Sequence, residues 1–182
     1  SPYRSWYDFD SKYKGGYRSW WGFETLPEVN EETPSYVEFI TGEGGVIDTW
    51  LRRGAAGFRL DVADELPDEF IEKVRTAVKR VGPDKFLLGE VWEDATTKFG
   101  FDKRRTYLLG KGLDSVMNYP FKNAVLGFVC GRDAGQTMTD ILSICEHYPA
   151  PALDTALNFL STHDTERALT VIADEPANGR GR

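Results

Sequence analysis

The stretch from Gly57 to Ala63 reads GFRLDVA, and its pattern decides the fold class that we expect. Its apolar residues predict a short strand, and the carboxylate of Asp61 comes where this strand ends. Two later stretches share the pattern: residues 86–91 read FLLGEV and include Glu90, and residues 156–164 read ALNFLSTHD and end with Asp164. We therefore expect strands whose carboxyl ends carry acidic side chains.

Helical patterns lie between the predicted strands. Strand and helix alternate in units of about 30 residues, as in a (β/α)8 barrel of roughly 250 residues, although a doubly wound sheet alternates as well. The predicted strands are residues 58–62, 86–91, 115–119 and 156–160. The predicted helices are residues 34–53 with a break at Gly44-Gly45, a helix from Pro67 to the stop at Gly82-Pro83, and residues 121–129, 134–147 and 165–172.

The charge and the cysteine content exclude several classes of function. The chain has 22 Lys and Arg against 29 Asp and Glu, a net charge of −7, which argues against nucleic acid or an anionic membrane as a partner. No stretch reaches the apolar length of a membrane span. Cys130 and Cys145 form no CxxC pair, so we expect half-buried thiols on helices and no metal site. The compartment is not defined by the sequence, and a cytoplasmic location is slightly favoured over secretion.

The predicted strand ends carry groups suited to the cleavage of a glycosidic bond. In a (β/α) barrel the carboxyl ends of the strands form the active site, so Asp61, Glu90 and Asp164 are expected at one rim. Cleavage needs one carboxyl group that protonates the leaving oxygen and another that attacks the anomeric carbon or activates water. Arg59 shares a strand face with Asp61, and its guanidinium favours the ionised carboxylate of a nucleophile. Apolar Val91-Trp92 beside Glu90 is expected to raise the pKa of this carboxyl, as a general acid requires.

Each of these features also has a simpler interpretation. Arg59 and Asp61 could form a structural ion pair, and Glu90 could be solvated after its strand. Asp164 could cap the helix that follows it, since aspartate is a favoured N-cap residue. The occurrence of three carboxylates at matching strand ends favours a catalytic site over these separate interpretations.

Four segments resemble signature motifs of the α-amylase family of glycoside hydrolases, which act on α-glucans. They read GFRLDVA at residues 57–63, GEVW at 89–92, STHDT at 161–165 and TLPEVN at 25–30. The resemblance implies an α/β fold, a partial (β/α)8 TIM barrel with roughly strands 4 to 7 and their helices. Residues 1–33 would be the end of the loop domain inserted in the barrel, and residues 34–182 the central part of the catalytic barrel.

The resemblance also implies roles for individual residues. Asp61 is expected as the nucleophile, Glu90 as the acid/base and Asp164 as the third carboxylate, which binds and distorts the sugar. Arg59 and His163 match the arginine and histidine around that sugar. The family mechanism is retaining hydrolysis of α-glucosidic bonds through a glycosyl-enzyme. The alternatives are a transglycosylase or isomerase of the same family, or a non-catalytic glucan-binding protein.

Two further residues are expected to bind substrate. A glutamate at the position of Glu65 resembles the motif of the neopullulanase, cyclomaltodextrinase and maltogenic amylase group, whose substrates include maltooligosaccharides and cyclodextrins. That group usually has Asn where this chain has Asp64. The alternative for Glu65 is a solvated loop carboxylate. Trp92 could stack on a pyranose face, as could Tyr17 and Trp20-Trp21, or these rings could be packing residues.

We expect the chain to be a piece of a longer protein, because the first motif and several strands of the family barrel have no match in it. Calcium sites of the family draw partly on those regions, so no cofactor is assigned, although calcium is possible in the full-length parent. A partial barrel exposes sheet edges, which predicts assembly as a homo-oligomer. An incomplete cleft predicts that the piece alone is inactive.

Overall fold

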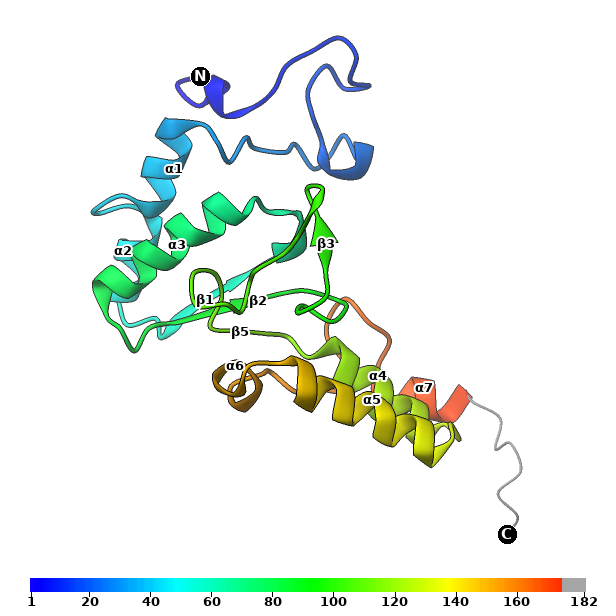
Figure 1. The fold of residues 1–182 in the computed structure, drawn as a ribbon. Helices are drawn as coiled ribbons and strands as arrows, with labels where there is room; N and C mark the ends of the chain where they lie inside the picture. The colour runs from blue at the N-terminus through cyan, green and yellow to red at the C-terminus, as the bar shows by residue number, and fades with distance from the viewer. Residues whose placement is uncertain (175–182) are drawn as a thin grey trace. The chain divides into compact units, whose positions relative to one another are not determined.

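The computed structural model describes residues 1–174, which form two compact units (Figure 1). The first unit comprises Ser1–Gly57 and Glu69–Lys85, and the second comprises Phe58–Asp68 and the chain from Phe86 onward. The last eight residues of the predicted barrel segment 34–182 lie outside the described residues. The assignment of residues 1–33 to an inserted domain stays a prediction.

The first unit contains three helices and an irregular N-terminal region. The helices are α1 (Pro34–Thr41), α2 (Val46–Arg52) and α3 (Asp68–Val81, from Glu69 within this unit), and two short 3-10 turns span Arg4–Trp6 and Trp20–Gly22. The predicted break at Gly44-Gly45 is confirmed. Gly44 has φ +74°, which favours glycine, and a Cβ on Gly45 would lie 2.7 Å from the carbonyl oxygen of Phe39.

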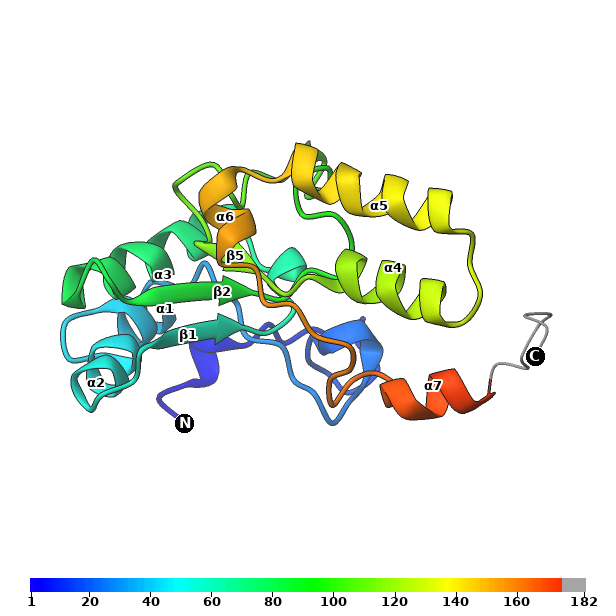
Figure 2. The ribbon, with the colours of Figure 1, turned by 90° about the horizontal axis from the view of Figure 1, so that it is seen from below.

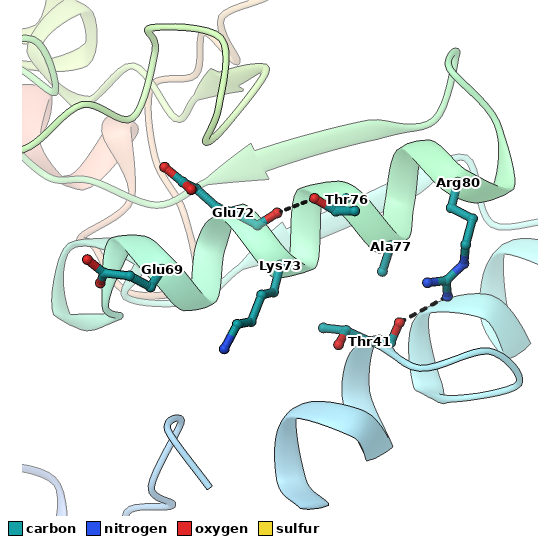
Figure 3. A pocket seen from close by; sticks show the side chains of 7 residues that line it. All are labelled: Thr41, Glu69, Glu72, Lys73, Thr76, Ala77 and Arg80. Carbon is teal, nitrogen blue, oxygen red and sulfur yellow. Dashed lines mark hydrogen bonds between the residues drawn. The ribbon is translucent and has the colours of Figure 1, made fainter. Parts of the chain in front are cut away.

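Arg80 connects the helices of the first unit. Its Nη2 donates to the Thr41 carbonyl at 2.9 Å and lies 2.6 Å from the buried carboxylate of Asp48 on α2. Figure 3 shows Arg80 reaching Thr41 beside a surface pocket of about 450 Å³ between α1 and α3. None of the predicted site residues lines this pocket. The helix predicted from Pro67 to Gly82-Pro83 is confirmed as α3, and its apolar residues Phe70, Ile71, Val74 and Val78 are buried.

The second unit contains a sheet whose strands lie in the order β1-β2-β5 (Figure 2). These are β1 (Gly57–Leu60), β2 (Phe86–Gly89) and β5 (Ser115–Val116), and β2 pairs with β5 in parallel through Leu88–Ser115 and Gly89–Val116. Figure 2 shows β1 and β2 pointing the same way, so their carboxyl ends lie at one edge. Asp61 follows β1 directly and Glu90 follows β2.

Helices follow the sheet along the chain. They are α4 (Tyr119–Val129), α5 (Ala134–His147), α6 (Ala150–Asp154) and α7 (Ala168–Asp174), and α4 contacts both α5 and α7. The Asp133 side chain accepts from the Gln136 N–H at 2.9 Å and caps α5. The two predicted helices at 121–129 and 134–147 are therefore confirmed.

Two strand predictions need correction. The strand predicted at 115–119 ends at Val116, because Asn118 caps α4 by accepting from the Phe121 N–H and Tyr119 is already helical. The strand predicted at 156–160 is wrong: this segment makes one parallel bridge, between Met117 and Leu157. Because α4 begins two residues after Met117, the segment that pairs with Leu157 is too short to extend this bridge into a ladder of strand hydrogen bonds.

Some features were not predicted from the sequence. The polar stretch after Glu90 contains a small antiparallel hairpin of β3 (Phe99–Gly100) and β4 (Lys103–Arg104), and α6 follows α5 after a short turn. Both thiols were predicted to be half-buried. This is confirmed for Cys130, which is partly buried just after α4, and is wrong for Cys145, which is exposed on α5. Among the described residues, no helix has the length and apolar character needed to cross a membrane.

Candidate active site

Arg59 bridges two of the predicted catalytic carboxylates. Its Nη1 donates to Asp61 Oδ1 at 2.8 Å, and its Nη2 lies 3.0 Å from Glu90 Oε2. Its Nε contacts the Met117 sulfur at 3.2 Å, which orients the guanidinium across the ends of β1, β2 and the segment after β5. The contact to Glu90 is a close ion pair without hydrogen-bond geometry, so the buried Nη2 keeps donor capacity between the two carboxylates.

Glu90 is buried and accepts several hydrogen bonds. The residue is 3 % exposed, Oε2 accepts from the Val62 N–H at 2.9 Å, and Oε1 accepts from Trp92 Nε1 at 3.0 Å and from the Tyr119 hydroxyl at 3.2 Å. Burial alone raises the pKa of Glu90, but these hydrogen bonds and the charge of Arg59 outweigh it and hold the pKa below its usual range. The predicted increase of this pKa is therefore wrong for the free site, because the apolar neighbours in sequence gave no sign of the donors.

Val62 has an unusual backbone conformation that serves Glu90. Its φ is 46°, in the left-handed region that β-branched residues rarely adopt. The strand–turn connection is fixed on both sides, since the Ala63 N–H donates to the Glu90 carbonyl at 3.0 Å and the Glu90 N–H donates to the Leu60 carbonyl at 3.0 Å. Strained backbone of this kind is typical of functional sites, and here it directs an N–H at a carboxylate.

Trp92 and Tyr119, which both donate to Glu90, form an aromatic cluster with Phe159. The rings of Trp92 and Tyr119 stack with centroids 4.6 Å apart and an interplanar angle of 14°, and Phe159 meets Tyr119 edge-on at 4.8 Å. Tyr119 is buried, whereas Trp92 is 46 % exposed. Sequence reasoning missed Tyr119 because it was included in a predicted strand. Tyr119 stands at the end of a predicted strand, as Asp61 and Glu90 do, and this position could have marked it as a candidate site residue.

The turn that carries Asp164 approaches the same aromatic cluster. The Asp164 N–H donates to Thr162 Oγ1 at 3.2 Å. Burial raises the pKa of Tyr119, and the negative charges of Glu90 and Asp164 raise it further. The charge of Asp164 therefore acts on Tyr119, whose hydroxyl donates to Glu90. Asp164 does not cap the helix after it, since α7 begins only at Ala168.

The remaining predicted residues occupy the rim of this site or the turn beside it. His163 is exposed, and its Nε2 lies 3.0 Å from Asp164 Oδ2. Glu65 is exposed in the 3-10 turn η3 (Ala63–Glu65), and its N–H donates to the Val62 carbonyl at 2.9 Å. Within residues 1–174, no group of three or more histidine, cysteine, aspartate or glutamate side chains is arranged to hold a metal ion.

Residues 3–180 match the family described as "Alpha amylase, catalytic domain", which covers nearly the whole chain. The chain belongs to the alpha-amylase family. The amylopullulanase of Thermoanaerobacter thermohydrosulfuricus is 34 % identical over 209 residues, spanning 99 % of this chain and 13 % of that protein. A cyclomaltodextrinase of Bacillus sp is 37 % identical over 152 residues, spanning 81 % of this chain and 25 % of that protein.

Solved structures of family members share the fold. The cyclic α-maltosyl-(1→6)-maltose hydrolase of Arthrobacter globiformis superposes with a TM-score of 0.83 at 29 % identity, over 95 % of this chain and 38 % of that one. The debranching enzyme of Nostoc punctiforme gives a TM-score of 0.81 at 28 % identity, over 95 % and 39 %. These similarities confirm the predicted α/β barrel fold. The chain spans less than two fifths of either solved structure.

Proposed function

We propose that the protein containing this chain hydrolyses α-glucosidic bonds in α-glucans, maltooligosaccharides or cyclodextrins with retention of configuration. The observation that carries this proposal is the Arg59 bridge, which unites Asp61 and Glu90 at the ends of adjacent strands. The names of the relatives, among them cyclomaltodextrinase and cyclic α-maltosyl-(1→6)-maltose hydrolase, support hydrolysis over transglycosylation or isomerisation. In the family barrel we assign the chain to roughly strands 4 to 7.

In the first step of the proposed reaction, a carboxylate oxygen of Asp61 attacks the anomeric carbon. The bond from this carbon to the leaving oxygen breaks, and Glu90 gives its proton to that oxygen. In the second step Glu90 takes a proton from water, the water oxygen attacks the anomeric carbon, and Asp61 is released. Asp61 suits the first role because its side chain is 73 % exposed while Arg59 binds one of its oxygens.

The low pKa of Glu90 in the free site places a condition on this mechanism, because the acid must be protonated in the first step. A sugar bound over Trp92 would accept from the donor left on Arg59 Nη2 and draw its charge away from Glu90. This change weakens the stabilisation of the carboxylate, so we propose that substrate binding raises the pKa of Glu90 toward the value of a general acid.

The other site residues are proposed to bind sugar. Asp164 and His163 form a pair at the rim and are assigned to the sugar whose anomeric carbon reacts. Trp92 offers a partly exposed ring next to Glu90, and a pyranose face can stack on such a ring. Glu65 is assigned to sugar beyond the cleaved bond, on the strength of the resemblance to the neopullulanase group.

The decisive experiment compares wild type and Asp61→Asn in the complete protein. With maltotriose, cyclodextrin and pullulan as substrates, we expect cleavage with an early α-anomer in proton NMR, and a loss of about 10³-fold or more in kcat in the variant. Asp102→Asn is the matched control, since Asp102 lies in the exposed β3–β4 turn with φ 58°, a conformation that asparagine tolerates. A wild type that cleaves none of these substrates, or cleaves with an early β-anomer, would contradict the proposal.

A further inference from the structure

Arg105 is a fully buried cation in the segment that follows Glu90 and the β3–β4 hairpin. Its side chain is 0 % exposed, and its ring-facing guanidinium lies 4.5 Å from the Tyr107 centroid and 5.1 Å from the Phe101 centroid. A buried guanidinium is costly to desolvate unless its donors are satisfied. The partners that satisfy these donors therefore show what the residue does.

All three guanidinium nitrogens of Arg105 donate to one short segment after Asp61. Nε donates to Asp68 Oδ1 at 2.7 Å, Nη1 to the Asp64 carbonyl at 2.6 Å and Nη2 to the Leu66 carbonyl at 2.6 Å. The planar fork of arginine suits this triple contact, which a lysine ammonium cannot reproduce in the same geometry.

The two carbonyls that Arg105 binds lie on either side of Glu65. The turn around Glu65 is a three-residue 3-10 turn, in which the Glu65 N–H donates to the Val62 carbonyl at 2.9 Å and the Leu66 N–H to the Ala63 carbonyl at 3.4 Å. Isolated 3-10 turns have poor hydrogen-bond geometry. Arg105 therefore fixes the backbone on both sides of Glu65 from the loop of the neighbouring strand.

Other cations of the same loop act on this segment from more exposed sites. Lys98 Nζ lies 3.0 Å from Asp64 Oδ2, and Lys103 Nζ lies 3.2 Å from Asp68 Oδ2. Both lysine side chains are partly exposed and pair with carboxylates, whereas Arg105 is buried and also binds two main-chain oxygens. The loop after the proposed acid/base thus places three cations against the segment after the proposed nucleophile.

We propose that Arg105 is a positioning residue for substrate recognition: it acts through Glu65 and holds this carboxylate where sugar beyond the cleaved bond binds. The inference rests on the proposed function, in which Glu65 contacts substrate. A purely structural arginine would change stability alone, whereas a positioning arginine changes the KM for longer substrates and depends on Glu65 for that effect.

The test uses Arg105→Lys in the complete protein, with Arg104→Lys as the matched control. Arg104 is the adjacent arginine, and its Nε and Nη2 donate to the Thr96 carbonyl, away from the Glu65 turn. We expect the Glu65 and Leu66 amides to exchange hydrogen about tenfold faster or more in Arg105→Lys, with no change in α5. We also expect the KM for maltooligosaccharides to rise about threefold or more at nearly constant kcat. The Arg104→Lys control should show neither change.

A double-mutant cycle tests whether Arg105 acts through Glu65. In a Glu65→Gln background, Arg105→Lys should change KM by less than about twofold, because the coupled residue is already altered. Asp68→Asn leaves both carbonyl contacts of Arg105 in place and should not raise KM, which separates positioning from stability even if Arg105→Lys folds poorly.

Three results would overturn the inference. They are unchanged exchange at Glu65 and Leu66, a fully additive KM effect in the cycle, and a KM increase in Asp68→Asn as large as that in Arg105→Lys. If the wild-type protein cleaves no glucan, the proposed function fails instead, and the exchange measurement still decides whether Arg105 fixes this turn.

Discussion

Trp92 combines two roles in one side chain, since its N–H donates to Glu90 and its exposed ring lies beside that carboxylate. The two roles can be separated by substitution. Trp92→Phe keeps an aromatic face and removes the donor, so KM should change little while the pKa of Glu90 rises. Trp92→Ala also removes the face, and KM should rise about tenfold, equivalent to ~1.4 kcal/mol. Steady-state kinetics on maltotriose would measure both, and equal KM values for the two variants would argue against sugar stacking.

The ionisation of Glu90 has a consequence for stability at acid pH. Because its pKa in the fold lies below the unfolded value of roughly 4.3, its contribution is fully present above that value and is lost as pH falls through the folded pKa. Glu90→Gln cannot lose a contribution in this way. Urea midpoints between pH 6 and pH 3 should therefore fall less steeply for Glu90→Gln than for wild type, and Glu146→Gln on the exposed face of α5 should follow the wild type. Identical slopes for Glu90→Gln and wild type would contradict this.

Among the elements, β2 is packed tightly around its last residue, Gly89. A Cβ on Gly89 would lie 2.2 Å from Leu113 Cδ1 and 3.2 Å from Ala63 Cβ. Gly89→Ala should therefore destabilise the fold by about 1–3 kcal/mol and displace Glu90, which follows it. Adding Leu113→Val shortens the clashing side chain and should restore part of the loss. Denaturant unfolding of the single and double variants measures the coupling, and strict additivity would show that the clash is relieved in some other way.

The elements also show what the sequence could predict. The strands that carry Asp61 and Glu90 at their ends and the helices at 121–129 and 134–147 were recognisable because apolar spacing is a local signal. The segment 156–160 was mistaken for a strand because its pairing depends on where α4 begins, which its own residues do not encode. The same limit applies to the site. The meeting of Asp61 and Glu90 was predictable from their strand ends, whereas Asp164 follows no strand. The pKa of Glu90 depends on Trp92 and on donors from Val62 and Tyr119, which approach it only in the fold.

For the whole molecule, the central question is what completes the barrel. The chain spans 13 % of one relative and 38 % of one solved structure, so the remaining strands must come from elsewhere if the cleft is to form. We propose that the 182-residue chain, expressed alone, associates through its sheet edges as a homo-oligomer and does not cleave maltosides. Size-exclusion chromatography with light scattering and a maltoside assay would test both points. A compact monomer would contradict the first, and turnover abolished by Asp61→Asn would contradict the second.

Two loops hold each other through hydrogen bonds donated in opposite directions, one by the Val62 N–H and the others by the Arg105 guanidinium. The loop after β1 supplies a donor to Glu90, and the loop after β2 supplies donors to the turn after Asp61. Glu90 and the turn after Asp61 are therefore each held by residues of the other loop. A chimera that takes residues 57–68 from a related enzyme without residues 86–107 would keep the carboxylates. It would lose matched hydrogen bonds between the two loops. The two segments are expected to be exchangeable between relatives only as a pair.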